Sequence, residues 1–401
     1  MNKAQLWSAL RAHPLSGWMN PADQDLPDLR EHSRLLWAGI GGSVLPSQTI
    51  VRALGSTSAR QAFVPLQSPE PMALHLESTD QVVLASKSGN TLELWTWIGR
   101  LRSLGGLDQL VHPPLVITQP DGNPLHRFAQ AQGHPVIDFP NTVGGRFSAF
   151  TAIGTLPLDW LGGDARAFLA GGREAVRQAE AGAKGHRAKL GPEGAAQDGP
   201  REAEAGEGVW GTRVWEAVEV LLQGYLQGVH AWAHLPYVQR LDRLGAWWVQ
   251  LVAESLGKTA PDGTRRGLDP IRGQGPMDQH AQLQRWLGGP RKIGVFMLTL
   301  QGSKAPERLD LPPQCPYAGL DRWRGTEILQ AQAEGTLEAL QAAGVPTLHW
   351  HLERLDEATL GAYLMSWQLI VGLLGMALEI DPFDQPEVEL GKKRTMGKLG
   401  L

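Results

Sequence analysis

Short apolar runs alternate with longer helical stretches along most of this 401-residue chain, and this alternation limits the folds that it can adopt. Between residues 34 and 140, each apolar run is closed by Gly, Ser, Pro or Asn, the residue types that commonly bound strands. The strands predicted here are Leu35–Ile40, Val82–Ala85, Leu115–Thr118 and Val136–Phe139. Strands that alternate with helices form βαβ units, whose strands pair in parallel. We therefore predict an α/β fold that begins with a mainly parallel sheet.

A second series of the same kind follows after residue 210. Its predicted strands are Val229–Leu235, Ile293–Leu300 and Thr347–His351. Its predicted helices are Val214–Tyr225, Leu241–Leu256, Met277–Leu287, Ile328–Ala343 and Glu357–Ile380. A single core usually stops growing at about 250–300 residues, so a chain of this length is expected to form two subdomains. We expect two doubly wound subdomains, at 1–175 and 211–380, each with a mainly parallel sheet flanked by helices.

The remaining segments are of lower complexity. Residues 181–208 are rich in Gly, Ala, Glu and Lys and include Pro192 and Pro200, with almost no large apolar side chain. Such a composition buries too little apolar area to offset the entropy of ordering the chain. We therefore predict a mobile surface excursion over 176–210, which is more often a plain linker than a partner site. A C-terminal tail is expected at 381–401.

Composition narrows the class of protein. Hydrophobic residues make up 42% of the chain and charged residues 19%, as in ordinary globular proteins, and the formal net charge is only −4. A weakly negative net charge does not indicate the positively charged surface that would bind nucleic acid or an anionic membrane. The N-terminus lacks a signal peptide and the apolar segment 369–378 is too short to span a bilayer, so a cytoplasmic location is expected.

Disulfide and metal chemistry are not expected either. Cys315 is the single cysteine, which excludes an intramolecular disulfide and a thiolate zinc site. The 12 histidines include no convincing helical His-x-x-x-His pair with a neighbouring carboxylate. We predict no metal and no cofactor.

The segment Ser86-Lys87-Ser88-Gly89-Asn90-Thr91 lies between a predicted strand and a predicted helix. A strand that turns tightly into a helix exposes unpaired amides and the positive end of the helix dipole, which together bind phosphate. The hydroxyls of Ser86, Ser88 and Thr91 could donate to phosphate oxygens, with Lys87 beside them. The same residue types also serve as ordinary helix caps, and the segment alone does not separate the two interpretations.

A second loop, Gly39-Ile40-Gly41-Gly42-Ser43, follows another predicted strand and would let a ligand approach the backbone at Gly42 and Ser43. Its spacing is not Gly-x-Gly-x-x-Gly, and no acidic residue ends a second strand at the expected distance. A dinucleotide site is therefore not expected.

Four residues could carry proton-transfer chemistry, although each also has an ordinary structural interpretation. Glu254 lies among large apolar residues at the end of a predicted helix, where burial could tune a base, but glutamates at helix ends are usually exposed. Arg146 follows two glycines, a setting from which a guanidinium could face an enediolate. His280 near a helix start could act as an acid or base, or as a cap. Lys392 could donate a proton or simply lie in a soluble tail.

Read together and in order, these motifs resemble those of the glucose-6-phosphate isomerase family, over residues 35–395. The motifs that carry the resemblance are Gly39–Ser43, Ser86–Thr91, Val143–Ser148, Glu254–Lys258, Asp278–His280 and Asp384–Lys393. The resemblance implies two sugar isomerase subdomains and an aldose-ketose isomerase that interconverts glucose 6-phosphate and fructose 6-phosphate.

The resemblance also implies roles for individual residues. Glu254 would move the proton between C2 and C1, and Arg146 would stabilise the enediolate. His280 and Lys392 would assist opening of the sugar ring, and Gln385 would line the sugar site. The phosphate would lie among Ser86, Lys87, Ser88 and Thr91, flanked by Gly42 and Ser43.

Members of this family are typically homodimers in which the histidine enters the neighbouring subunit's site, so the resemblance implies that His280 acts in trans. Two positions depart from the family pattern: Leu256 replaces an Asn, and Glu387 replaces a Gly. Two alternatives remain open, namely a dual isomerase that also accepts mannose 6-phosphate and a phosphosugar sensor without catalytic activity. Retention of Glu254 argues against the sensor, because binding alone needs no base.

Overall fold

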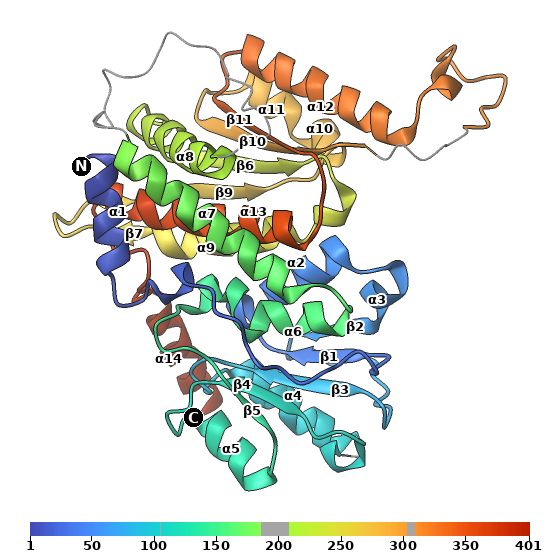
Figure 1. Ribbon diagram of the computed structural model, residues 1–401, viewed down its shortest axis with the longest axis vertical. Coiled ribbons are helices and arrows are strands. Elements are labelled where there is room, and N and C mark those ends of the chain that lie inside the picture. The colour runs from blue at the N-terminus through green and yellow to red at the C-terminus, as the bar shows by residue number, and fades with distance from the viewer. Residues whose placement is uncertain (105, 186–207, 303–308) are drawn as a thin grey trace.

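The computed structural model describes residues 1–104, 106–185, 208–302 and 309–401. Within these ranges the chain forms two parallel sheets with helices on both faces of each (Figure 1). This architecture confirms the predicted α/β class with two doubly wound, mainly parallel sheets.

The first sheet contains five parallel strands in the order β2-β1-β3-β4-β5. These are β1 (Leu35–Ala38), β2 (Phe63–Leu66), β3 (Gln81–Ala85), β4 (Leu115–Thr118) and β5 (Val136–Asp138). Two of the predicted strands are shorter than expected, since β1 ends before Gly39 and β5 ends before Phe139. The sequence did not indicate β2, which contains Pro65 and lies at the edge of the sheet, where a missing backbone donor is tolerated.

The second sheet has the order β11-β10-β6-β9, again with all strands parallel. Its strands are β6 (Ala231–Pro236), β9 (Asp269–Arg272), β10 (Ile293–Leu300) and β11 (Thr347–Leu352). Strand β9 was also not predicted, because Asp269, Pro270 and Arg272 leave it little apolar character. A small antiparallel pair, β7 (Lys258–Thr259) and β8 (Arg265–Arg266), lies outside both sheets.

Each sheet has one face that is turned away from the other sheet, and helices cover that outer face. Helices α4 (Leu92–Ser103) and α5 (Pro124–Gln132) pack on the first sheet, and α11 (Leu283–Gly288) and α12 (Gly325–Ala342) pack on the second. The predicted helix over 277–287 is broken at Gln282, so that the short α10 (Met277–Ala281) precedes α11.

The largest core lies between the two sheets and is shared by them (Figure 1). The helices between the sheets or beside this core are α1 (Lys3–Ala12), α2 (Leu45–Leu54), α3 (Thr57–Ala62), α6 (Ala152–Trp160), α7 (Ala165–Gly185), α8 (Val209–Leu226), α9 (Leu244–Leu256) and α13 (Glu357–Ala377). Trp37 of the first sheet and Phe296 of the second belong to the same buried cluster. The two sheets are therefore held together by a common apolar layer.

Helix α13 runs through this layer and is almost wholly buried. Within the described ranges, it alone has the length and apolar composition of a membrane span, but 89% of its apolar window is covered by the rest of the protein. It contains the apolar segment 369–378 except for Leu378, and it ends three residues earlier than predicted. Such burial is characteristic of a central helix in a folded domain.

Two further segments differ from the predicted ones. Helix α7 continues to Gly185, so the first ten residues of the predicted excursion 176–210 are helical, and α8 begins at Val209. Residues 186–207, the main part of that excursion, lie outside the described residues. The C-terminal segment 381–401 contains helix α14 (Val388–Leu399). The domain boundaries themselves stay predictions.

Candidate active site

The two predicted phosphate loops meet at the carboxyl edge of the first sheet. They follow β1 and β3, which are neighbouring parallel strands, so both loops leave the sheet at the same edge. The first loop forms a short 3-10 turn over Gly41–Ser43 and packs tightly against a distant segment. A Cβ atom on Gly42 would lie 2.1 Å from the carbonyl oxygen of Gly145, so the absence of a side chain lets this loop contact the loop that carries Arg146.

The second loop uses some of its hydroxyls internally. The Ser86 hydroxyl lies 2.8 Å from the Thr91 hydroxyl and accepts a hydrogen bond from the Gly89 amide at 3.1 Å. Gly89 has a φ of +69°, which L-residues rarely adopt. Ser86 is buried, so its visible role is to shape the turn, whereas Ser88 is exposed.

Helix α4 starts at this loop without a side-chain cap. Thr91 occupies the N-cap position, and its hydroxyl makes no capping hydrogen bond. Amides in the first turn of the helix therefore stay available to an anion. This geometry favours the phosphate interpretation of the segment over simple capping, for Ser88 and Thr91 in particular.

Lys87 points from the same loop toward the Arg146 region. Its ammonium group donates a hydrogen bond to the carbonyl oxygen of Val143 at 2.8 Å and lies 5.9 Å from the centre of the Phe139 ring. Burial lowers the pKa of Lys87, and the nearby positive charge of Arg146 lowers it further. The loop thus places a partly desolvated cation beside the hydroxyls that are predicted to bind phosphate.

Arg146 is the most heavily anchored polar residue of the site. It is buried, and its guanidinium donates four hydrogen bonds: to the Ser255 hydroxyl at 2.8 Å, the Gln385 side-chain oxygen at 3.0 Å, and the carbonyl oxygens of Pro382 at 2.6 Å and Asp384 at 2.8 Å. Burial lowers its pKa, opposed by the carboxylates of Glu254, Asp384 and Asp381. These contacts hold Gln385 at the site.

Glu254 stands beside this guanidinium. It lies near the end of α9, with one carboxylate oxygen 3.5 Å from the Nη1 atom of Arg146. Its other carboxylate oxygen accepts a hydrogen bond from the Gln250 amide at 3.2 Å. One third of the Glu254 side chain is exposed, so the carboxylate is both held in place and open to a ligand.

Two residues without a predicted role complete the arrangement. A Cβ atom on Gly41 would lie 2.5 Å from the Gln250 side-chain nitrogen, so Gln250 links the first loop to Glu254. Lys258 is buried and pairs with Asp384 at 2.7 Å, which ties the segment after α13 to the end of α9. The sequence could have indicated a role for Lys258, because it belongs to the Glu254–Lys258 motif. For Gln250 the sequence offered only its position four residues before Glu254 on the same predicted helix.

The structure does not bring His280 and Lys392 into this cluster. His280 is exposed on α10, beyond the carboxyl end of β9 in the second sheet. Lys392 is exposed on α14 and pairs with Glu389 at 2.6 Å. Among the hydrogen bonds and ion pairs of the described residues, none joins either side chain to Arg146 or Glu254.

The two departures from the family pattern lie in different surroundings. Leu256 is fully buried in the core between the sheets, where its apolar side chain packs well. Glu387 is exposed just before α14, where a negative charge favours the start of a helix.

One group of potential metal ligands occurs in the part of the chain that the structure describes. Glu31, His32 and His112 bring one donor atom each within 4.8 Å of one another. They precede β1 and β4 and so lie at the amino edge of the first sheet, opposite the loops described above. The expected absence of a metal at the candidate active site stays a prediction.

The chain is similar to known enzymes over nearly its whole length. No protein-family model matches it. It is 32% identical to the glucose-6-phosphate isomerase of Thermus thermophilus, with 98% of this chain and 92% of the relative covered. It is 31% identical to a probable glucose-6-phosphate isomerase of Haloarcula marismortui, over 90% of this chain and 77% of the relative.

A solved structure shows the same fold. A crystal structure of a glucose-6-phosphate isomerase from Chlamydia trachomatis superposes with a TM-score of 0.72 at 18% identity, covering 99% of this chain and 84% of that one. The two predicted phosphate loops and the Glu254–Arg146 pair agree with the extent of the sequence similarity. This chain belongs to the glucose-6-phosphate isomerase family.

Proposed function

We propose that this protein interconverts glucose 6-phosphate and fructose 6-phosphate by proton transfer through an enediol or enediolate, as a cytoplasmic enzyme of glycolysis and gluconeogenesis. The observation that carries the proposal is the Glu254 carboxylate 3.5 Å from the buried Arg146 guanidinium. Proton abstraction beside a carbonyl needs a base and a positive charge near the oxygen that becomes negative, and this pair supplies both.

The phosphate group would be bound first and would fix the position of the sugar. Ser88, Thr91 and the free amides of the first turn of α4 offer hydrogen-bond donors, and Lys87 offers a positive charge. The backbone of Gly42 and Ser43 would flank the phosphate from the neighbouring loop. Ser86 would contribute by holding the turn, because its hydroxyl is already engaged within the loop.

Glu254 would then move the proton. Starting from glucose 6-phosphate in its open form, its carboxylate takes the proton from C2, and the electron pair of that bond forms the double bond between C1 and C2. The oxygen on C1 becomes negatively charged and takes up the proton of the C2 hydroxyl. The same carboxylate returns its own proton to C1, and C2 becomes the carbonyl carbon of fructose 6-phosphate. The four hydrogen bonds that fix Arg146 mean that its charge needs no rearrangement during the step.

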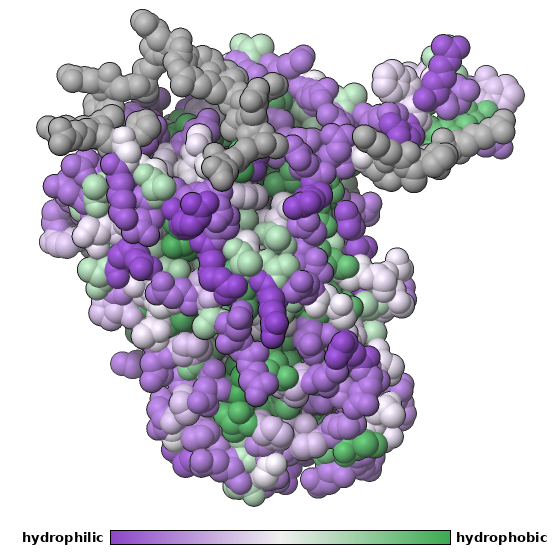
Figure 2. Space-filling view, viewed as in Figure 1, coloured by the Kyte–Doolittle hydropathy of each residue, from purple (hydrophilic) through white to green (hydrophobic). Residues whose placement is uncertain are grey.

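A homodimer would supply the remaining groups. We infer that His280 acts in the site of the neighbouring subunit and, with Lys392, assists ring opening. Two features support this inference: among the described residues no contact joins His280 to Glu254, and apolar side chains of the second half are exposed, one of them on the helix of His280. Met277 is 68% exposed on the same short helix. Tyr317 and Trp323 are 68% and 56% exposed and belong to the segment before α12, which projects from the body at the upper right in Figure 1 and in the same view in Figure 2.

A coupled assay tests the reaction. The purified protein is given fructose 6-phosphate, and glucose 6-phosphate is followed with a dehydrogenase in the presence of EDTA. We expect turnover that resists EDTA and that falls at least 100-fold in Glu254→Gln, while phosphosugar binding is retained, because the amide keeps the shape and removes the base. Near-normal turnover in the variant would refute the role of Glu254. Binding without turnover in the wild type would favour a sensor, and equal turnover of mannose 6-phosphate would show a dual isomerase.

Subunit mixing tests the shared site. Glu254→Gln and His280→Ala are each expected to be weakly active, whereas a refolded equal mixture should recover roughly a quarter of wild-type activity, since one site in each heterodimer is then intact. A mixture no more active than its components would show that His280 does not act in trans.

A further inference from the structure

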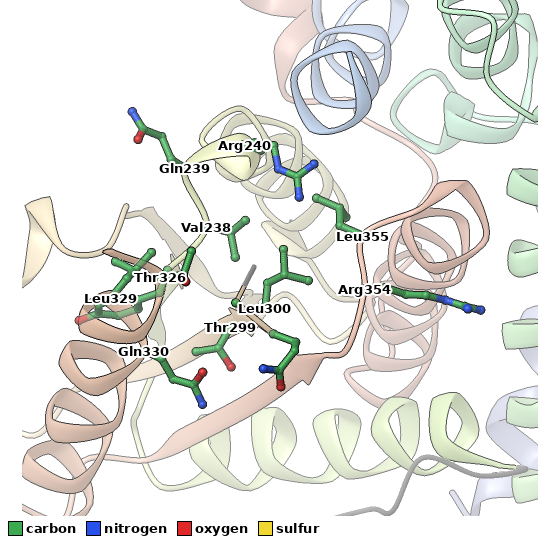
Figure 3. Close-up of a pocket in the computed structure, with 13 residues that line it drawn as sticks. Val238, Gln239, Arg240, Thr299, Leu300, Thr326, Leu329, Gln330, Arg354 and Leu355 are labelled. Atoms are coloured by element: carbon green, nitrogen blue, oxygen red, sulfur yellow. The ribbon is translucent and has the colours of Figure 1, made fainter. Parts of the chain in front are cut away.

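A pocket of about 480 Å³ opens at the carboxyl edge of the second sheet (Figure 3). Its walls come from the segment after β6, the end of β10, the segment after β11 and the first turns of α12. The lining residues used below are Arg240, Thr299, Thr326, Gln330, Arg354 and Leu355. The volume lies within the range of ordinary small-molecule sites.

The position of this pocket corresponds to that of the phosphate loops in the first sheet. In the first sheet, β2 lies on one side of β1, and β3, the next strand in the sequence, lies on the other side of β1. In the second sheet, β9 lies on one side of β6, and β10, the next strand in the sequence, lies on the other side of β6. In open α/β sheets, ligands bind at the carboxyl edge where the strand order reverses in this way. The proposed active site uses this point in the first sheet, and the pocket lies at the same point in the second.

Polar groups without partners line the pocket. The hydroxyl oxygen of Thr326, at the second position of α12, is buried and makes no hydrogen bond with the described residues. Because a buried hydroxyl without a partner is costly, this oxygen is suited to a ligand. The Thr299 hydroxyl differs, since it is already engaged with His349 and His351 at 2.8 and 2.9 Å.

The charge of the lining indicates the kind of ligand. The described residues that line the pocket include two arginines and no carboxylate. Arg240 makes no hydrogen bond or ion pair with the described residues, and in Figure 3 its guanidinium is turned toward Leu355. Arg354 instead pairs with Asp356 at 2.7 Å and points away from the other labelled side chains. The unpaired Arg240 cation, together with the Thr326 hydroxyl at the start of a long helix, favours an anionic ligand. The leucines around them favour a ligand that also has an apolar part.

We propose that this pocket is a second binding site, for a small phosphorylated metabolite, distinct from the active site. Arg240 and the Thr326 hydroxyl contact the phosphate, and Gln330 contacts polar groups of the body. Since the two sites lie on different sheets, each chain binds two phosphates, and the loss of one site leaves the other.

Equilibrium dialysis with radiolabelled inorganic phosphate tests the proposal on the full-length protein. We expect two phosphates per wild-type chain and one in the double variant Arg240→Ala/Thr326→Val, with isomerase turnover unchanged. Ser88→Ala/Thr91→Ala should lose the other phosphate. Arg354→Ala is the matched control and should still bind two, because its guanidinium is paired and points away.

Several outcomes would overturn the proposal. One phosphate in the wild type that is lost only in the Ser88→Ala/Thr91→Ala variant would show that the pocket binds none. Two phosphates retained in Arg240→Ala/Thr326→Val would place the second site elsewhere. Equal thermal melting of wild type and variants confirms that lost binding is not lost folding. Isomerase turnover is measured separately, so failure of this proposal is distinct from failure of the proposed reaction.

Discussion

At the scale of the residue, the predicted phosphate contact of Lys87 should depend on pH. Its ammonium group is partly desolvated and close to the buried Arg146 guanidinium, and both effects lower its pKa. As pH rises, Lys87 therefore loses its proton earlier than an ordinary lysine does. Since the proton carries the charge that would attract phosphate, binding should weaken over the same range.

We predict that the KM for fructose 6-phosphate rises as the pH is raised through the lowered pKa of Lys87, with a smaller change in kcat. In Lys87→Arg the KM should stay level over that range, because a guanidinium remains charged. Steady-state kinetics between neutral pH and pH 10 measure this. The same rise in Lys87→Arg would assign the titration to another group.

A second residue-scale prediction concerns the phosphate hydroxyls. Ser88→Ala together with Thr91→Ala should raise KM about tenfold or more while changing kcat little, since hydrogen bonds to charged groups contribute about 1.5–3 kcal/mol each. Ser103→Ala, at the far end of the same helix, is the control and should leave KM unchanged. An unaltered KM in the double variant would mean that the phosphate binds elsewhere.

At the scale of elements, the contact between α7 and α13 decides how the two halves meet. The helices approach so closely that each places a glycine against the other's backbone. A Cβ atom on Gly361 of α13 would lie 2.1 Å from the carbonyl oxygen of Phe168, and one on Gly171 of α7 would lie 2.0 Å from that of Ala358. Both obstacles are backbone atoms, so a side chain at either position requires the helices to move.

We predict that Gly361→Ala lowers the free energy of unfolding by about 1–3 kcal/mol, the usual cost of overpacking a core. Gly99→Ala is the matched control, because Gly99 is also helical but has nothing within 4 Å of its added Cβ atom. That control should be neutral or slightly stabilising, since alanine favours the helix. Urea unfolding measures both, and equal effects would contradict the close helix contact.

At the scale of the whole molecule, the core between the sheets contains a buried histidine. His234 on β6 is fully buried, its ring bonds the Tyr363 hydroxyl at 2.7 Å, and it packs beside Trp248. Burial lowers the pKa of His234 to about 3. In the unfolded chain its pKa is about 6.5, so below that pH the unfolded state binds a proton that the folded state does not.

Stability should therefore be complete above pH 6.5 and should fall as the pH is lowered from 6.5 toward 3. At pH 4.5, two units below the unfolded value, the loss from this residue should be roughly 2–3 kcal/mol. Urea unfolding of wild type and His234→Phe at pH 7 and pH 4.5 measures it. The variant should lose less stability than the wild type between the two pH values. Parallel losses would show that His234 is not the group responsible.

The sequence alone determined most of the strands and helices and the chemistry of the short loops. Strands β3, β4 and β10 were predicted almost to the residue, because continuous apolar runs bounded by glycine, serine or proline have few other interpretations. The loop over Ser86–Thr91 was recognisable because a strand, a glycine turn and a helix are contiguous in the chain. The edge strands β2 and β9 were not predicted, because each contains a proline and has side chains that are only partly buried or exposed.

Only the tertiary structure decided which distant residues meet. Arg146, Glu254 and Gln385 are widely separated in sequence. Their meeting depends on α9 of the second half packing against the turns after β1 and before α6, and on the segment after α13 binding Arg146 and Lys258. The same packing brings Gln250 to Glu254 and Lys258 to Asp384. His280 and Lys392, plausible by sequence, lie outside this cluster, because one belongs to the other sheet and the other to an exposed helix. Local patterns are set by neighbouring residues, whereas a site built from five segments is set by how the layers pack.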